Sequence, residues 1–291
     1  MRYEGTVYRP PSEANSLLIQ ATIGCPHNKC TFCPMYKGTR FRLRPVAEIM
    51  EDLKMAYDHY GNIVKSLFFP DGNTIIMKTS DLVQIFEYAK SLFPELNRIT
   101  VYGSARYASK KSLDEFVLLH EMGLTRIHMG MESGDDITLA KIQKGATAEQ
   151  ITDAGCKIRQ AGIELSEYYL VGAGGQERTK EHALESARVL SQIKPEFVRL
   201  RTVVPVPDTP LYQDYSSGDF HLLSPHQALQ EIRSLIEHMD SEGTTILSDH
   251  VSNYWNVQGV LNKDRDLMLA QVDKALAIPE SRFRPAHLSA L

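Results

Sequence analysis

The sequence of 291 residues contains only four cysteines. Four thiols are too few to hold a chain of this length together as a disulfide scaffold. Long apolar runs are also missing, since none reaches the roughly 20 residues that a membrane-spanning helix needs. The first residues, "MRYEGTVYRPPSEAN", lack the apolar core of a secretion signal. These absences predict a cytoplasmic protein without a membrane partner.

An excess of basic residues is absent as well. The chain has 32 lysines and arginines against 36 aspartates and glutamates, a net charge of -4. A surface that binds nucleic acid normally carries a basic excess, so the balance argues against nucleic acid as a partner. A hydrophobic content of 43% and a charged content of 23% are typical of a globular protein with a substantial core.

What the sequence does contain is a cluster of thiols. Cys25, Cys30 and Cys33 lie within the nine residues "CPHNKCTFC". Structural zinc takes four protein ligands, so His27 or Cys156 would have to complete a zinc site. Three thiolates on a cubane iron–sulfur cluster leave one iron open to an exogenous chelator. The loop by itself favours the cluster and leaves zinc and a redox-active thiol as alternatives.

Along the chain, short β-rich runs alternate with longer helical patterns. Strands are expected at 16–23, 64–70, 99–104, 126–131, 164–172 and 197–204. The helical patterns between them fall at about 46–60, 80–93, 111–122, 148–161 and 178–193. Strands that alternate with helices predict parallel pairing with right-handed crossovers, in an incomplete (β/α) barrel or a doubly wound open sheet. Either arrangement places an active site at the carboxyl ends of the strands, where the cysteine loop follows the first strand.

The alternation breaks at the proline-rich "PVPDTPLY" after Val204. A helix at about 224–241, a strand at 244–249 and a helix near 264–277 are expected beyond it. We therefore expect three parts: an N-terminal extension at 1–15, a barrel core at 16–204, and a C-terminal α/β extension at 205–291 that closes the barrel.

The cysteine loop resembles that of the radical S-adenosylmethionine (radical SAM) superfamily. That family's usual loop is C-x3-C-x2-C with an aromatic residue before the last cysteine. Here the spacing is C-x4-C-x2-C, one residue longer, with Phe32 in the aromatic place. The resemblance implies a partial (β/α)6 barrel similar to a TIM barrel, a [4Fe–4S] cluster on the three cysteines, and S-adenosylmethionine with Phe32 near its adenine end.

The turn after the second strand fits the same resemblance. In "FPDGN", Asp71, Gly72 and Asn73 stand where the family receives the amino group of the methionine moiety. Asn73 can accept through its side-chain carbonyl but brings no charge. The alternative is an ordinary strand-to-helix turn, because Asp-Gly-Asn is common turn chemistry.

"MGMESGDD" follows the fourth strand and resembles the ribose-binding region, with Glu132 and Ser133 as candidates. Glu132 could instead cap the helix that begins near Asp135. Arg159 resembles an arginine that pairs with the methionine carboxylate in many relatives, or it lies with Lys157 on a solvated helix face.

The fifth strand ends in "YYLVGAGGQE", which resembles the family's glycine-containing element after that strand. Val171 is the aliphatic residue that this resemblance places against adenine. The match in total covers roughly residues 16 to 204.

The resemblance implies an enzyme that reductively cleaves S-adenosylmethionine, with electrons from a flavodoxin- or ferredoxin-type donor. The resulting 5′-deoxyadenosyl radical would abstract hydrogen from a small or medium organic substrate under anaerobic conditions. Because only Cys156 lies outside the loop, a second cluster with full cysteine ligation is excluded. This disfavours sulfur insertion and leaves oxidoreductase or lyase chemistry: rearrangement, bond cleavage, dehydrogenation or decarboxylation. The motifs "FFPDGN" and "GMESG" most resemble those of the group around oxygen-independent coproporphyrinogen oxidase and the elongator-type enzymes.

Two other functions stay open at this stage. The protein could be an activase that generates a glycyl radical on a partner enzyme, or a zinc-stabilised binding protein without enzymatic activity. No side chain is assigned as a catalytic residue. Candidates for substrate contact, each with solvent exposure or packing as the alternative, are Tyr36, Arg40, Arg42 and Arg44 after the cysteine loop, Ser104 and Arg106 after the third strand, and His250, Asn253, Tyr254 and Trp255 near the C-terminus.

Overall fold

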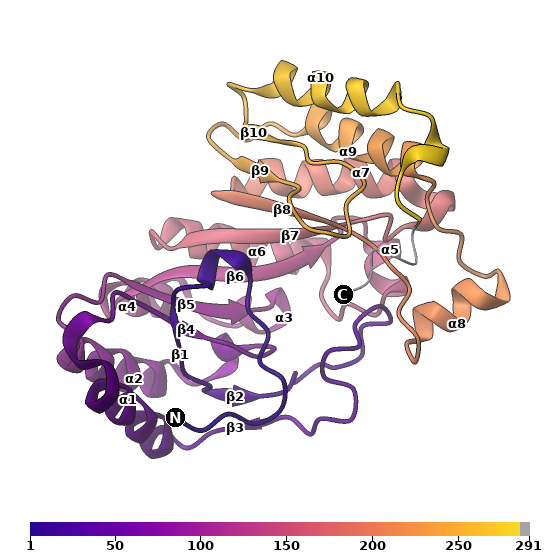
Figure 1. The fold of residues 1–291 in the computed structure, drawn as a ribbon. Coiled ribbons are helices and arrows are strands. Elements are labelled where there is room, and N and C mark those ends of the chain that lie inside the picture. Colours follow the sequence, from indigo (N-terminus) through magenta and orange to yellow (C-terminus); the bar gives the residue numbers. More distant parts are fainter. Residues whose placement is uncertain (286–291) are drawn as a thin grey trace. The chain divides into compact units, whose positions relative to one another are not determined.

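The computed structural model describes residues 1–285 (Figure 1), and the chain forms two compact units. The first unit consists of Met1–Asn28, Tyr36–Met129 and Lys157–Leu165. The second consists of Lys29–Met35, Gly130–Cys156 and the chain from Ser166 onward.

The first unit contains parallel strands in the order β1-β4-β5-β6. Their bounds are Leu17–Leu18 for β1, Ser66–Phe69 for β4, Arg98–Gly103 for β5 and Leu124–Glu132 for β6, whose last residues belong to the second unit. A separate antiparallel pair joins β2 (Thr22–Ile23) to β3 (Arg42–Leu43). Helices α1 (Val46–Tyr60), α2 (Thr79–Leu92), α3 (Ala105–Ala108) and α4 (Leu113–Glu121) follow the strands, with 3₁₀ turns at Pro11–Glu13, Gly61–Ile63 and Thr74–Ile76.

Local sequence explains these helices. In α1, Ile49, Leu53 and Ala56 recur at helical spacing and are fully buried. Helix α4 begins with a complete capping box, in which Ser112 and Glu115 each accept a backbone N–H of the other. Helices α1, α2 and α4 form one layer over the sheet of this unit (Figure 1).

The second unit continues with β7 (Glu164–Val171), β8 (Phe197–Thr202), β9 (Thr245–Leu247) and β10 (Gln258–Val260), in that order. The pairs β7–β8 and β8–β9 are parallel, and β10 is antiparallel to β9. The helices are α5 (Asp136–Lys141), α6 (Ala148–Gln160), α7 (Gly175–Ile193), α8 (Pro210–Ser217), α9 (Pro225–His238) and α10 (Arg265–Leu276), with a 3₁₀ turn at Glu280–Arg282. Helices α7, α9 and α10 pack side by side as a layer (Figure 1).

The predicted α/β class, with parallel strands each followed by helices, is confirmed. The strand expected at 16–23 is divided into β1 and β2. Helices α5 and α8 and strand β10 were not expected, because each is too short to show a clear period. The three-part division of the chain stays a prediction, and neither compact unit begins at residue 16 or 205.

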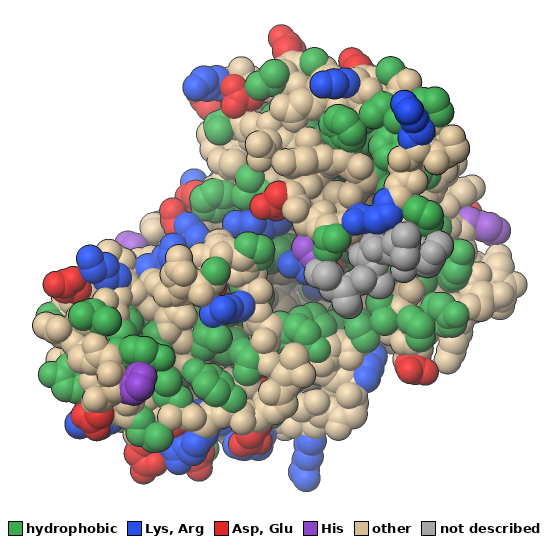
Figure 2. All heavy atoms as spheres, in the orientation of Figure 1, with side chains coloured by type: hydrophobic (Ala, Val, Ile, Leu, Met, Phe, Trp, Pro, Cys, Tyr) green, Lys and Arg blue, Asp and Glu red, His purple; other side chains and the backbone are tan. Residues whose placement is uncertain are grey.

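Within residues 1–285, no helix combines the length and the apolar character needed to cross a membrane. Basic and acidic side chains are interspersed on the face shown in Figure 2.

Candidate cofactor and substrate site

The cysteine loop begins in the first unit, directly after β2. Cys25 packs against the turn that follows β4: a β-carbon built on Gly72 would lie 2.7 Å from the Cys25 β-carbon. The Gly72 N–H donates to the Gly24 carbonyl at 3.1 Å, and the Asn28 N–H donates to Cys25 Sγ at 3.4 Å. Only a residue without a side chain fits at position 72. The Asp-Gly-Asn turn thus brings its backbone against the first thiol.

Asp71, which precedes Gly72, binds the start of the cysteine loop through its carboxylate. Its Oδ2 accepts the Gly24 N–H at 3.2 Å and the Gln20 amide at 3.1 Å. Burial raises the pKa of this carboxyl group to about 6, against the opposing effect of those donors. Its backbone adopts a φ of 75°, a conformation that non-glycine residues hold mostly at turns and functional sites. The side chain predicted to touch the cofactor therefore positions the loop.

Asn73 has the geometry of an oriented acceptor. The side chain is 1% exposed, and its Nδ2 donates to Ser104 Oγ at 2.8 Å. That bond fixes the amide, and Oδ1 is buried without a hydrogen-bond partner in the described chain. A buried acceptor without a donor is costly, so this atom fits a ligand that brings an N–H group, as the ammonium of a methionine moiety does.

The rest of the cysteine loop belongs to the second unit. The Thr31 N–H donates to the Ile142 carbonyl at 3.0 Å, and the Thr31 carbonyl accepts the Leu211 N–H at 3.0 Å. Helix α8, which carries Leu211, begins with Thr209 as N-cap and Pro210 in the first turn. The proline-rich segment after β8 therefore anchors the loop that carries Cys30 and Cys33.

Phe32 lies in an apolar cluster of this unit. It packs on a group of buried side chains, namely Ile142, Leu170, Ala173, Val203 and Leu211. Val171 was the predicted adenine contact, but the residue that packs with Phe32 in this cluster is its neighbour Leu170. Successive side chains of a strand point to opposite faces, so an error of one position selects the wrong face.

Glu132 stands at the end of β6 with a φ of 62°. Its Oε1 accepts from Lys144 Nζ at 2.9 Å, with both side chains less than 15% exposed. Gly130 makes room for this pair, because a β-carbon there would collide with the Glu132 carboxylate. Burial lowers the pKa of Lys144, but the negative charges of Glu132, Cys30 and Cys33 outweigh it and raise the pKa. Lys144, which was not predicted, thus places a positive charge beside two of the loop thiols.

Glu167, in the middle of β7, was also missed. The side chain is fully buried, and neither carboxylate oxygen has a hydrogen-bond partner in the described chain. Burial raises its pKa well above the ordinary value, with Lys144 opposing the shift. The signal in the sequence was a single charge inside the otherwise uncharged run "LSEYYLV".

Two predicted cofactor contacts do not fit that role. Ser133 is fully buried, with its hydroxyl bonded to His182 Nδ1 at 2.8 Å and to the Asp135 N–H at 3.0 Å. It therefore ties the end of β6 to α7. Arg159 lies near Glu164, the first residue of β7, where burial lowers its pKa and the Glu164 carboxylate opposes that shift. This is the amino end of the strand, whereas cofactors bind at the carboxyl ends.

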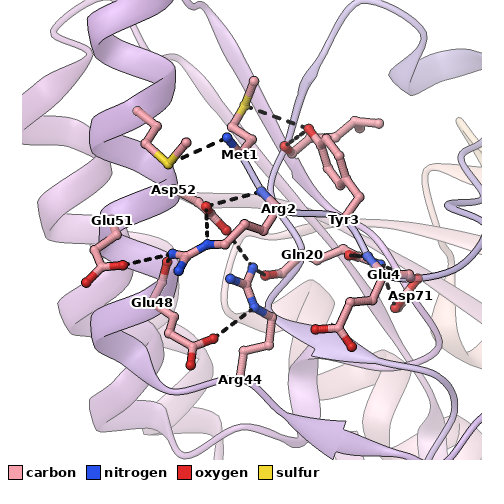
Figure 3. Close-up of polar contacts among 12 residues, drawn as sticks. Met1, Arg2, Tyr3, Glu4, Gln20, Arg44, Glu48, Glu51, Asp52 and Asp71 are labelled. Carbon is pink, nitrogen blue, oxygen red and sulfur yellow. Dashed lines mark hydrogen bonds and ion pairs between the residues drawn. The ribbon is translucent and has the colours of Figure 1, made fainter.

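Two of the basic residues after the cysteine loop, Arg42 and Arg44, pair with protein carboxylates, and Figure 3 shows those of Arg44. Arg44, only 4% exposed, pairs with Asp52 at 2.7 Å and donates to the Gln20 carbonyl at 2.8 Å. Arg42 is exposed and pairs with Glu4. Arg42 and Arg44 therefore do not point the same way, and the prediction that both face a substrate is wrong.

The remaining candidates of the first unit separate into buried and exposed side chains. Tyr36 is buried and meets the Tyr8 ring edge to face. Ser104 accepts the hydrogen bond that orients the Asn73 amide. Arg40 is exposed. Arg106 is also exposed, with its guanidinium 6.0 Å from the Tyr107 ring.

Near the C-terminus, most of the candidates have structural contacts. Asn253 accepts from the Thr202 hydroxyl at 2.9 Å and donates to the Leu200 carbonyl at 2.8 Å, which fastens its loop to β8. Tyr254 packs edge to face on Phe283. The Trp255 carbonyl accepts from the Ser248 hydroxyl at 3.1 Å. His250 remains as a side chain with functional potential.

A pocket of about 350 Å³ adjoins the Phe32 cluster in the second unit. It shares Ile142, Ala173 and Leu211 with that cluster. Charged side chains of both signs, including Lys141, Asp214 and Asp219, complete its lining.

All four cysteines are free thiols of intermediate exposure. Within residues 1–285, no group of three or more His, Cys, Asp and Glu side chains is arranged to hold a metal ion. Each unit by itself nevertheless carries groups that suit a [4Fe–4S] cluster and S-adenosylmethionine. The first has the Cys25 thiol and the unpartnered Asn73 oxygen, an acceptor for an ammonium group. The second has the Cys30 and Cys33 thiols and the Phe32 cluster, an apolar surface for a purine.

The fold and these residues define an α/β protein of the type that holds a cofactor at a cysteine loop after its first strand. The model of the Radical SAM superfamily matches residues 19–190, more than half of the chain. The chain therefore belongs to the radical SAM superfamily, whose cofactors are a [4Fe–4S] cluster and S-adenosylmethionine.

Characterised and uncharacterised relatives support the same membership. The chain is 25% identical over 230 residues to an uncharacterized protein of Methanocaldococcus jannaschii, covering 75% of this chain and 69% of that protein. It is 23% identical over 244 residues to the tRNA-2-methylthio-N(6)-dimethylallyladenosine synthase of Dehalococcoides mccartyi, covering 83% of this chain and 57% of the synthase. An uncharacterized methyltransferase of Pyrococcus horikoshii is matched over only 41% of its length.

Solved structures share the fold. Coproporphyrinogen III oxidase of Escherichia coli has a TM-score of 0.55 at 14% identity, over 84% of this chain and 64% of the oxidase. Methylornithine synthase has a TM-score of 0.54 at 18% identity, over 88% of this chain and 68% of the synthase. The elongator-type protein Elp3 of Methanocaldococcus infernus has a TM-score of 0.51. The chain thus shares its fold with a coproporphyrinogen oxidase and an elongator-type protein, and the nearer relation expected to that group stays a prediction.

Proposed function

We propose that the protein is a radical SAM enzyme that acts on a small or medium-sized organic substrate by rearrangement, bond cleavage, dehydrogenation or decarboxylation. Cys25, Cys30 and Cys33 would hold a [4Fe–4S] cluster, which together with bound S-adenosylmethionine would supply the radical chemistry that removes hydrogen from the substrate. A flavodoxin- or ferredoxin-type protein is the proposed electron donor.

The observation that carries the proposal is the packing of Gly72 against Cys25, next to the orphaned oxygen of Asn73. The turn after β4 meets the first thiol through its backbone, and one residue later presents a buried acceptor. This order matches a chelated methionine moiety, whose ammonium group needs a hydrogen-bond acceptor close to the iron that it binds.

Each residue then has a defined task. Cys25, Cys30 and Cys33 hold the cluster, and Asn73 Oδ1 accepts from the methionine ammonium. Glu132 accepts from the ribose hydroxyls through Oε2, because Lys144 occupies Oε1. Phe32 and Leu170 provide the apolar surface for adenine. Asp71 and Ser133 support these groups through the backbone of their loops.

The test is metal analysis of protein purified and reconstituted without oxygen. We expect about four irons and four sulfides per chain, and 5′-deoxyadenosine on addition of S-adenosylmethionine and a reductant. Cys30→Ala should lose both. Cys156→Ala is the matched control, since the Cys156 thiol bonds the Gln192 carbonyl at 3.7 Å and lies outside the cysteine loop, so this variant should keep both.

Other outcomes separate the alternatives. Zinc without iron or sulfide would support a zinc-stabilised binding protein and refute the enzyme. A glycyl radical signal on a mixed partner protein would identify the activase function. Iron content that is equal in wild-type protein and Cys30→Ala would also refute the proposed site.

A further inference from the structure

Strand β8 carries two arginines on one face. Its burial alternates, with Val198, Leu200 and Thr202 buried and Phe197, Arg199 and Arg201 partly exposed. Paired residues of parallel strands point to the same face of the sheet. In the β7–β8 register Tyr168 is paired with Arg199, and Leu170 with Arg201. The two guanidinium groups therefore lie on the face that also carries Tyr168 and Leu170.

Neither arginine has a carboxylate partner in the part of the chain that the structure describes, whereas Arg126 and Arg178 are paired with Glu164 and Asp135. The Nε atom of Arg199 is buried without a hydrogen-bond partner. A buried donor on a cation, without an acceptor, is among the most costly groups in a protein. The positive charges of Arg199 and Arg201 are therefore not balanced by a carboxylate of the described residues.

The surroundings orient Arg201 and add a neutral donor. The Arg201 guanidinium lies 4.9 Å from the centroid of the Tyr168 ring, a cation–π distance. His250 Nδ1 accepts the Ser252 N–H at 3.1 Å, which leaves the ring proton on Nε2. Burial, and then the charge of Arg201, lower the His250 pKa to about 4, against the opposing effect of Asp249. His250 is thus neutral at pH 7, and its Nε2–H is a donor rather than an acceptor.

This face is also the one next to the proposed cofactor site. Leu170, paired with Arg201, belongs to the cluster on which Phe32 packs, and Phe32 precedes the ligand Cys33. A substrate on this face would approach the adenine end of the cofactor from β8.

We propose that Arg199 and Arg201 bind an oxyanion of the substrate, a carboxylate or a phosphate, in the second unit. The substrate role rests on the proposed function, whereas the anion site depends only on β7, β8 and the loop that carries His250. Two guanidinium groups two residues apart on one strand suit a group with two or more oxygens, since each can donate in parallel to it.

The experiment uses the full chain without cluster, titrated with inorganic phosphate or malonate at constant ionic strength. Binding is followed by calorimetry and by the shift in Tm. We expect saturable binding of at least one of the two anions, and the stronger one identifies the class of oxyanion. Arg199→Gln and Arg201→Gln should each weaken it by about tenfold or more. Arg188→Gln is the matched control, because that exposed arginine on α7 pairs with Glu185 and should bind like wild type.

Arg201→Lys serves as a second variant if Arg201→Gln unfolds. It should bind the anion more weakly than the wild type, because an ammonium group cannot donate the two parallel hydrogen bonds of a guanidinium group. Equal responses of wild type and all variants, or no binding of either anion, would overturn the proposal. Unchanged anion binding in Arg201→Gln, with S-adenosylmethionine binding lost after reconstitution, would also overturn it and assign the arginines to the cofactor. Failure to assemble a cluster would instead count against the proposed function and leave the anion site standing.

Discussion

Gly72 and Cys25 pack backbone against side chain, so that a β-carbon on residue 72 would lie 2.7 Å from that of Cys25 and 2.8 Å from its α-carbon. Both are atoms with little freedom to move. A displacement of the turn after β4 would therefore displace Cys25 as well.

Gly72→Ala should displace the cysteine loop. Overpacking of this kind costs about 1–3 kcal/mol, and here relaxation requires movement of Cys25. We expect iron content after anaerobic reconstitution to fall by more than half, as measured by metal analysis. Gly155→Ala is the control, because its β-carbon would meet the Ile193 side chain at 2.7 Å, which is equally close, and neither residue belongs to the proposed site. If both variants lose iron in proportion to their loss in Tm, the effect is one of general stability.

Lys144→Met should make the cluster harder to reduce. The lysine charge lies near Cys30 and Cys33, and removing a positive charge from the surroundings of a cluster lowers its reduction potential. A spectroscopic redox titration of the reconstituted protein would measure the shift. Lys141→Met, on the rim of the pocket, is the matched charge control. An equal potential in both variants would contradict the placement of Lys144.

The same substitution should also lower stability. Lys144→Met leaves Glu132 without its partner and the buried Glu167 without the one cation that lowers its pKa. Removing one member of a buried pair costs about 3–5 kcal/mol, less here because Glu132 keeps some contact with solvent. Urea unfolding at pH 7 measures this, and Lys144→Met with Glu132→Gln should recover part of the loss. A single variant as stable as wild type would refute the pair's role.

Asp71→Asn should flatten the dependence of stability on pH in the metal-free protein. The folded-state pKa of about 6 lies above the ordinary aspartate value of 3.8, so the folded state binds more protons between these values. Stability from this group is greatest below about pH 4 and falls as pH rises through 6, by about 3 kcal/mol at most. Asparagine tolerates a positive φ and retains an acceptor for the Gly24 N–H. The difference in unfolding free energy between pH 4.5 and pH 7 should therefore be smaller in Asp71→Asn than in the wild type. An equal difference in both proteins would contradict this.

Arg201→Gln should raise the pKa of His250 from about 4 towards its ordinary value. Burial is the larger cause and remains, so the pKa should stay below 6.5. A histidine whose pKa is lowered on folding destabilises the protein as pH falls from about 6.5 to 4, because the unfolded state binds the proton first. The variant should lose stability less steeply over this range. NMR titration of the His250 ring measures the pKa, with Arg188→Gln as control; an unchanged value would place Arg201 farther from the ring.

Much of the fold could be predicted because period and turn chemistry are local. The boundaries of α1 agree with the pattern at 46–60, and Ser224 and Pro225 begin α9 as expected. The first strand was predicted too long, since β1 pairs with β4 and ends at Leu18, whereas β2 begins at Thr22 and pairs with β3. Pairing partners that lie far away in the sequence decide where a strand stops.

By itself, the sequence determined the superfamily, the three thiols and the place of the loop after the first strand, because these are matters of residue type, spacing and order. Only tertiary structure decided which polar side chains are already satisfied. Arg44 and Ser133 have protein partners that lie far along the chain, whereas Asn73 Oδ1, Arg199 Nε and the Glu167 carboxylate do not in the described residues. Whether a buried group is paired depends on packing between distant segments, and no local pattern records it.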